Sequence, residues 1–205
     1  MKYRSSSLIK SRENLFFTFV APSINIIHES THLKKCNLEP PERPPDFLRH
    51  AMCCLAASSS KTLSHLQDPL YQSSRRLLQE AEIKDLNFDK VSIVHAQTWI
   101  MIAVYELKEC FLHRCLMSIS RAVRLVQLLR LYCVDRTERL GTQQPKLVSL
   151  PADWLSAEER RRLFWFTFLM DRYTAISLGW PVLLDTRDVS MTSACVLHCQ
   201  QLIFV

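Results

Sequence analysis

The sequence predicts an all-α domain built from several helices, and three observations support this fold class. Apolar residues recur at three- and four-residue steps in at least five segments, which is the spacing of amphipathic helices. No segment shows the strong apolar–polar alternation of a half-buried strand. Glycine occurs only as Gly141 and Gly179, whereas its average usage is about 7%. A chain of 205 residues is long enough for one such domain to bury a core.

The composition also excludes several kinds of function. Walker loops and dinucleotide-binding loops need several glycines where the backbone approaches phosphate, and this chain lacks them. The net charge of +6 is modest and scattered, so it predicts a solvated basic surface rather than direct nucleic-acid binding. No run approaches the roughly 20 apolar residues of a membrane span. Eight cysteines without a C-x-x-C pair or a convincing secretory signal indicate reduced intracellular thiols.

The region before residue 46 contains a tail, a first apolar segment and a connector. Residues 1–13 are polar and basic and predict a loose tail. Residues 15–27 form the apolar segment, which Pro22 interrupts. Residues 40–45 contain four prolines, which exclude a helix and predict a stiff, extended connector.

Two helices are predicted after the connector. Asp46 is expected to cap the first, which extends to about Ser59. Asp68 and Pro69 are expected to open the second, as a cap followed by a proline whose missing N–H costs nothing at the first helical position. The apolar positions are Phe47, Ala51, Cys54 and Leu55 in the first helix, and Leu70, Leu77, Leu78 and Ala81 in the second.

Two longer helices are predicted in the middle of the chain. One begins at Asp89 and continues through Tyr105, and the other extends from about Leu112 to Tyr132. The apolar seam of the later helix comprises Leu116, Ile119, Val123 and Val126, while Arg114, Arg121 and Arg124 share a different face.

The last predicted helix follows an irregular stretch at residues 133–155. Ser156 and Glu159 match a capping box, in which the serine hydroxyl accepts a hydrogen bond from the third N–H and the glutamate reaches back to the cap. The helix is expected to end at Leu178, with Gly179 as a left-handed stop.

Five stretches within these helices carry a family likeness. They are Ala51–Ala57 (AMCCLAA), Tyr71–Leu78 (YQSSRRLL), Gln97–Glu106 (QTWIMIAVYE), Ser120–Gln127 (SRAVRLVQ) and Ser156–Pro181, which contains the motifs LFW, DRY and LGWP. In this order and at these spacings they resemble the fungal-specific transcription factor domain, the middle homology region of fungal zinc binuclear-cluster transcription factors. The resemblance covers residues 14–189 and leaves an atypical apolar tail at residues 190–205.

The resemblance implies a non-enzymatic regulator in the nucleus that acts in RNA polymerase II transcription. Many relatives control specialised-metabolite pathways. The implied partners are proteins of the transcription machinery or a DNA-binding partner, and a small apolar effector bound between helices is also expected. DNA contact is expected to be indirect, and neither a membrane partner nor a cofactor is expected. The zinc of the family belongs to an N-terminal six-cysteine cluster, which nothing before Cys36 matches.

The sequence departs from the family pattern in its glycines and at its end. Cys110, Ser120 and Arg130 stand where the family has glycine, and Trp180 replaces the usual arginine before proline. Since the family domain would continue with further helices, the apolar tail predicts a truncation at the C-terminus or an altered product. A degenerate, non-functional remnant is therefore one alternative.

Four charged residues are predicted to form a polar network between helices. Arg121 and Arg124 lie beside the apolar seam, from which guanidinium groups can bridge to carboxylates or helix-end carbonyls of neighbouring helices. Asp171 and Arg172, near the end of a hydrophobic helix, are expected to take part in such a lock. Because paired buried charges more often specify a fold than perform chemistry, a structural and regulatory role is expected for all four.

A second alternative function comes from the H-E-x-x-H pattern of zinc proteases. On a helix, His28 and His32 would face one metal ion and Glu29 would activate its water. A catalytic zinc needs a third protein ligand, and the nearby candidates Glu39 and Glu42 lie in the stiff connector. A zinc-dependent metallohydrolase is thus the alternative from a different functional class.

Overall fold

The computed structural model describes residues 13–40, 42–85, 91–134, 151, 153–185 and 187, and every regular element within them is helical. The predicted all-α fold class is therefore confirmed. The helices are α2 (Glu29–Cys36), α3 (Asp46–Ser58), α4 (Gln67–Lys84), α5 (Ile93–Lys108), α6 (Leu112–Leu128) and α7 (Trp154–Leu178), with the short 3₁₀ helices η1 (Ser64–Leu66) and η2 (Leu131–Cys133). Residues 13–19 are also helical.

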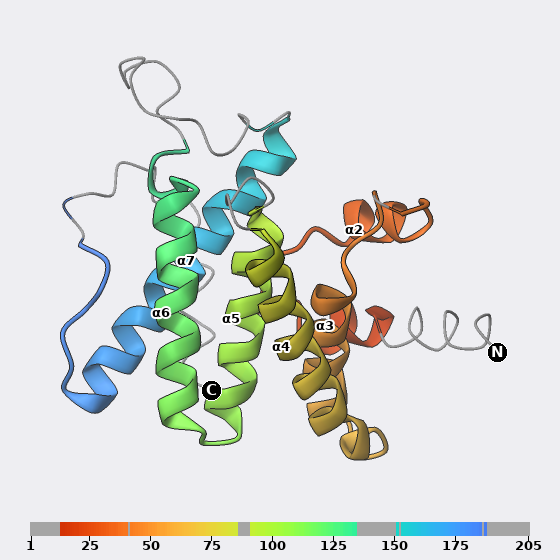
Figure 1. Ribbon diagram of the computed structural model, residues 1–205, viewed down its shortest axis with the longest axis horizontal. Helices are drawn as coiled ribbons and strands as arrows, with labels where there is room; N and C mark the ends of the chain where they lie inside the picture. Colours follow the sequence, from red (N-terminus) through yellow and green to blue (C-terminus); the bar gives the residue numbers. More distant parts are fainter. Residues whose placement is uncertain are drawn as a thin grey trace.

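Helix α5 lies at the centre of the bundle (Figure 1). It contacts α3 and α4 on one side and α6 on the other, and α7 packs against α6. Around α5 the side chains of Trp99, Ile100, Met101 and Ala103 are completely buried. A helix that is apolar around most of its circumference is stable only when neighbours cover its faces. The layers of the domain are therefore organised around α5.

The core contains most of the predicted apolar positions. In α6, Ile119, Val123 and Val126 are buried and Leu116 is half-buried, as the seam predicts. Five of the six described cysteines are buried thiols, and Cys110 is exposed. None of the described helices combines the length and the apolar character that crossing a membrane requires.

Two predicted helix caps are wrong, because each carboxylate has another partner. Pro45 is the N-cap of α3, and Asp46 is the first helical residue, with its carboxylate 3.6 Å from the guanidinium of Arg49. Helix α4 begins one residue before Asp68. The Asp68 carboxylate instead accepts a hydrogen bond of 2.8 Å from the Tyr105 hydroxyl, which joins α4 to α5.

The predicted capping box at the start of α7 is also wrong. Asp153 is the N-cap, and its side chain accepts a hydrogen bond of 2.8 Å from the backbone N–H of Ser156. Glu159 does not reach back to the cap. Its carboxylate accepts a hydrogen bond of 2.7 Å from the backbone N–H of His28 and so ties the first turns of α7 to the start of α2.

Helix α5 begins with a capping box that sequence analysis did not identify. Ser92 is the N-cap, and its side chain and backbone pair with the backbone and ring of His95. The ring stands in for the glutamate or glutamine that usually completes this motif. The predicted start, Asp89, lies outside the described residues.

Three described residues have a left-handed backbone conformation, and each lies just after a helix or between two helices. Gly179 has φ +68° and ends α7, as predicted. Helix α6 ends at Leu128, earlier than predicted, because Arg130 adopts φ +54° before η2. Cys110 has φ +59° in the connection between α5 and α6. Two of the three positions where the family pattern has glycine therefore hold L-residues in the left-handed region.

Replacing Arg130 or Cys110 with glycine is expected to stabilise the domain. An L-residue in the left-handed region lowers the free energy of unfolding by about 1–2 kcal/mol. Glycine removes this cost, but its larger conformational entropy in the unfolded state offsets about 0.5–1 kcal/mol of the gain. Arg130→Gly and Cys110→Gly should each raise the free energy of unfolding by roughly 0.5–1 kcal/mol in urea denaturation. The third position, Ser120, lies inside α6, so Ser120→Gly should lower the stability by about 0.5 kcal/mol. A shift of the same sign in all three variants would contradict this explanation.

Candidate functional site

A buried carboxylate, Glu106 of α5, joins three helices. Its side chain is completely buried. It accepts hydrogen bonds of 2.7 Å from the Tyr71 hydroxyl of α4 and of 2.7 Å from the Ser118 hydroxyl of α6. Arg75 of α4 also donates to it and forms an ion pair. Burial and the hydrogen bond to Glu106 raise the pKa of Tyr71, so its hydroxyl keeps its proton and remains a donor.

A second junction surrounds the buried ring of Trp99 in α5. The indole N–H donates to the carboxylate of Glu82 in α4. The guanidinium carbon of Arg121 in α6 lies 4.6 Å from the centre of the ring, and its Nη1 lies 3.5 Å from Glu82 Oε2. A cation over an indole face adds an electrostatic attraction to the packing. Arg121 therefore bridges α6 to α4 across α5.

The other arginine of this pair, Arg124, lies in a different environment. It is exposed, and its hydrogen bond of 3.0 Å goes to the side chain of Gln127 on the same helix. Among the residues that the structure describes, no hydrogen bond or ion pair joins Arg124 to Arg121, Asp171 or Arg172.

Asp171 and Arg172 hold the segment that follows α7. Asp171 is 3% exposed, and its carboxylate accepts hydrogen bonds of 3.0 Å from the backbone N–H groups of both Leu183 and Leu184. Arg172 donates to the carbonyl of Leu184, pairs with Asp171 at 3.0 Å and lies 4.3 Å from the centre of the Phe168 ring. The two charged side chains thus hold residues 183–184 against α7, and we refer to this pair as the Asp171–Arg172 clasp.

The two histidines of the H-E-x-x-H pattern have different partners. His28 precedes α2 as its N-cap, and its Nδ1 accepts a hydrogen bond from the backbone N–H of Thr31. His32 lies within α2, and its Nε2 is 3.6 Å from a carboxylate oxygen of Glu13. Among the described residues, the group that could hold a metal ion contains His32 but not His28. This geometry gives the metallohydrolase alternative no support.

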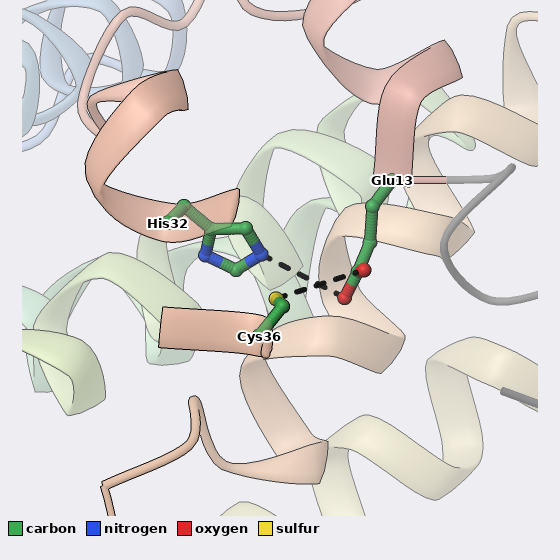
Figure 2. Close-up of side chains that lie close together, drawn as sticks. All are labelled: Glu13, His32 and Cys36. Atoms are coloured by element: carbon green, nitrogen blue, oxygen red, sulfur yellow. Dashed lines mark hydrogen bonds and ion pairs between the residues drawn. The ribbon is translucent and has the colours of Figure 1, made fainter. Parts of the chain in front are cut away.

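The buried group around His32 comprises Glu13 and Cys36, which Figure 2 shows, together with Arg49. Figure 2 shows the carboxylate of Glu13 pointing toward the ring of His32 and the thiol of Cys36. Arg49 of α3 donates to Glu13 Oε1 at 2.7 Å, and the Cys36 thiol lies 3.8 Å from Oε2. The pKa of Glu13 is lowered, because desolvation, which would raise it, is outweighed by the hydrogen bond from Arg49 and by the positive charge and proximity of Arg49 and His32. Sequence analysis missed this group, although the four-residue spacing of His32 and Cys36 on one helix face was visible.

A basic groove of about 450 Å³ lies beside Glu106 at the surface. Its lining residues are Tyr71, Gln72, Arg75, Arg76, Gln79 and Arg114. Two of its arginines are already paired, Arg75 with Glu106 and Arg76 with Glu80. Three guanidinium groups line the groove, so its chemistry suits a ligand that carries an anionic group.

Several large apolar side chains are exposed on and after α7. Ile176 is 81% exposed and Trp180 is 60% exposed, and Tyr173, Val182 and Leu183 are also exposed. We refer to these five residues as the α7 apolar surface. Exposed apolar residues that gather in one region often mark a contact with another protein.

Comparisons with known proteins identify a family and its relatives. The family model of the fungal specific transcription factor domain matches residues 14–201. The chain is similar to a pigment biosynthesis transcriptional activator of Monascus ruber, with 34% identity over 87% of this chain and 32% of that protein. It is similar to an ascochitine biosynthesis cluster transcriptional regulator of Didymella fabae, with 34% identity over 84% of this chain and 29% of that protein.

A citrinin biosynthesis transcriptional activator of Monascus ruber is 32% identical over 90% of this chain and 35% of that protein. The chain thus spans about a third of the length of these curated relatives. No solved structure matches the chain.

Removing the charge of Glu106 is expected to destabilise the domain strongly. Glu106→Gln would leave Arg75 without its carboxylate next to the core. Because the Arg75 side chain is 25% exposed, the loss should fall somewhat below that of a fully buried pair, at about 2–3 kcal/mol in the free energy of unfolding. The matched control is Glu80→Gln, which breaks the exposed pair with Arg76 and should cost less than about 0.5 kcal/mol. Equal losses in the two variants would show that Glu106 does not organise the helices.

Proposed function

We propose that this chain, which belongs to the fungal specific transcription factor domain family, is the regulatory domain of a transcription regulator. The regulator is proposed to act in RNA polymerase II transcription. The family match over residues 14–201 is the observation that carries this proposal. It is joined by relatives whose names describe them as transcriptional activators or regulators. A nuclear location follows from the same proposal.

The target genes are proposed to belong to a specialised-metabolite pathway. The three relatives described above are named for pigment, ascochitine and citrinin biosynthesis. The chemistry of this chain does not select one product among these, so the proposal extends only to the class of pathway.

A non-enzymatic role is supported by how the buried charges are used. The carboxylates of Glu106 and Asp171 each accept hydrogen bonds from at least two groups of the domain itself. A carboxylate that acts as a general base needs reach to a substrate proton. Here the charges are used to hold helices and loops together, which suits a scaffold. We also propose a structural and regulatory role for four charged residues, Arg121, Arg124, Asp171 and Arg172.

Contact with DNA is proposed to be indirect for this domain. Its positive charge is modest, and its basic groove is occupied in part by intramolecular ion pairs. A basic stripe free to follow phosphates is the usual footprint of direct binding. We propose that a zinc-cluster module or a DNA-binding partner supplies sequence recognition.

The α7 apolar surface is proposed as the contact with a protein partner of the transcription machinery. Its apolar side chains lie beside the Asp171–Arg172 clasp, which fixes the backbone of Leu183 and Leu184. A surface held in one conformation loses less entropy on binding than a mobile one. The small apolar effector expected from the sequence remains a separate proposal, whereas the groove lined by Arg75, Arg76 and Arg114 would suit an effector that carries an anionic group instead.

A reporter assay tests the proposed function and its surface together. The full chain, fused to an unrelated DNA-binding module, should change reporter output relative to the module alone. Ile176→Lys with Val182→Lys should move the output back toward that of the module by several-fold, because both side chains are exposed and charges there would oppose an apolar contact.

The matched control for this assay is Ile83→Lys, since Ile83 of α4 is 73% exposed and lies outside the α7 apolar surface. It should leave the output unchanged. A fusion that is expressed and folded, as judged by cooperative melting of the purified chain, but leaves the reporter silent would contradict the regulator. A chain that does not melt cooperatively would instead favour the degenerate remnant.

A further inference from the structure

Three side chains that commonly bind zinc meet inside the domain, near its first described residues. Glu13 belongs to the helical residues 13–19, and His32 and Cys36 belong to α2. All three residues are at least nine-tenths buried, and their ligand atoms lie within 4.8 Å of one another. We propose that Glu13, His32 and Cys36 form a binding site for a divalent transition-metal ion, with Zn²⁺ as the best-matched ion.

The distances are close to those that one tetrahedral ion requires. Zinc binds histidine nitrogen and carboxylate oxygen at about 2.0–2.2 Å and cysteine sulfur at about 2.3 Å. Tetrahedral angles then place nitrogen and oxygen about 3.4 Å apart, and sulfur and oxygen about 3.6 Å apart. The observed separations are 3.6 Å between His32 Nε2 and Glu13 Oε1, and 3.8 Å between Cys36 Sγ and Glu13 Oε2. These two distances end on the two different oxygens of the Glu13 carboxylate, and all three ligand atoms lie within 4.8 Å of one another. A rotation of the carboxylate that turns one oxygen toward both His32 and Cys36 would close the site around an ion.

The local fold of α2 explains why two of these ligands share one side. His32 and Cys36 are four residues apart, so their side chains lie one above the other on the same face of the helix. The helix begins at Glu29, immediately after the His28 cap, and the ring of that cap turns to Thr31. The ligand set therefore differs from the H-E-x-x-H pattern in two of its three members.

An unpartnered nitrogen provides an independent sign of a ligand. His32 is 4% exposed, and its buried Nε2, 3.6 Å from Glu13 Oε1, is too far from that oxygen for a hydrogen bond and has no other hydrogen-bond partner. A buried polar atom in this state costs free energy. A metal–nitrogen bond would satisfy it, and Figure 2 shows this nitrogen directed toward the Glu13 carboxylate rather than away from it.

Arg49 fits the proposed site as the partner that orients the carboxylate. Its Nε donates to Glu13 Oε1 at 2.7 Å and holds the carboxylate in place. Ligating carboxylates usually have such outer partners. Asp46 lies 3.6 Å from the Arg49 guanidinium and adds a negative charge. With Asp46 counted, the group is formally neutral when it holds a divalent ion and a Cys36 thiolate.

The donor set selects the class of ion. One sulfur, one imidazole nitrogen and one carboxylate oxygen suit zinc and its neighbours, whereas magnesium and calcium take oxygen ligands. Three protein ligands leave a fourth position for water or another small ligand. A groove of about 280 Å³ is lined in part by His32, so the surface approaches the site from the side of the histidine.

Binding must displace one proton from the Cys36 thiol to solvent. Burial and the nearby charge of Glu13 raise the pKa of this thiol, so it is protonated near neutral pH without the ion. The affinity for the ion should therefore rise with pH, by about tenfold for each pH unit where the thiol is the only ligand that still loses a proton.

Cobalt binding by the purified, reduced full chain tests the site. After treatment with a chelator, titration with Co²⁺ should give one bound ion per chain, a thiolate-to-cobalt charge-transfer band in the near ultraviolet, and a higher melting temperature. Equimolar Zn²⁺ should abolish the band. Cys36→Ser and His32→Gln should each weaken binding by at least about tenfold while the helical circular dichroism is retained.

Two controls separate this site from other thiols and from the H-E-x-x-H pattern. Cys110→Ser removes an exposed thiol, and His28→Asn removes the other histidine of the pattern while keeping a side-chain acceptor at the N-cap of α2. Both variants should keep the band and the affinity. The proposal is overturned if the folded wild-type chain binds no cobalt, or if the band survives Cys36→Ser. Two further cysteines, Cys195 and Cys199, lie in the apolar tail at residues 190–205. A band lost on replacing these two instead would also overturn the proposal.

Discussion

The burial of a carboxylate in an apolar helix is the constraint on which the arrangement of this domain depends. Helix α5 is covered on most of its faces, and Glu106 lies in it without exposure to solvent. An ionised group in such a place is tolerated only with partners that neutralise and hydrogen-bond it. Those partners are Tyr71 and Arg75 from α4 and Ser118 from α6. The apolar faces bring the helices together, and the carboxylate then fixes their register.

The same rule applies at both edges of the domain. Asp171 is 3% exposed and accepts hydrogen bonds from the backbone of residues that follow α7. Glu13 is completely buried and pairs with Arg49 of α3 and His32 of α2. In each place one acid joins elements that the apolar packing alone would leave free to slide. Hydrophobic burial supplies most of the stability, and the acids supply the specificity of the arrangement.

Local signals in the sequence were sufficient for the fold class and insufficient for the ionic contacts. The apolar seam of α6 and the left-handed Gly179 depend on spacing and on backbone preference, so they were predicted. Asp46 and Ser156 were misassigned as caps because a cap depends on where the preceding chain enters the helix, and Pro45 and Asp153 decide that. The partners of Glu106 lie 12 to 35 residues away in sequence, and nothing local distinguishes this acid from a solvated one. The position of Arg121 beside the apolar seam of α6 followed from the sequence, but its contact with the ring of Trp99 did not.

One hydrogen bond joins α2 to α7, the two helices that carry the proposed metal ligands and lead to the proposed partner surface. The backbone N–H of His28, at the start of α2, donates to Glu159 in the second turn of α7. Helix α2 carries two of the proposed metal ligands, and α7 leads to the exposed apolar side chains proposed to contact a partner. Contact alone does not make these sites communicate, since coupling requires an element with two arrangements that both sites bias differently. Helix α2 is observed in one arrangement, the helical one. It has only eight residues, too few to be stable as an isolated helix, so its conformation depends on what its two ends bind. An ion held by His32 and Cys36 would favour the helical arrangement, and that arrangement is the one that presents the His28 N–H to Glu159.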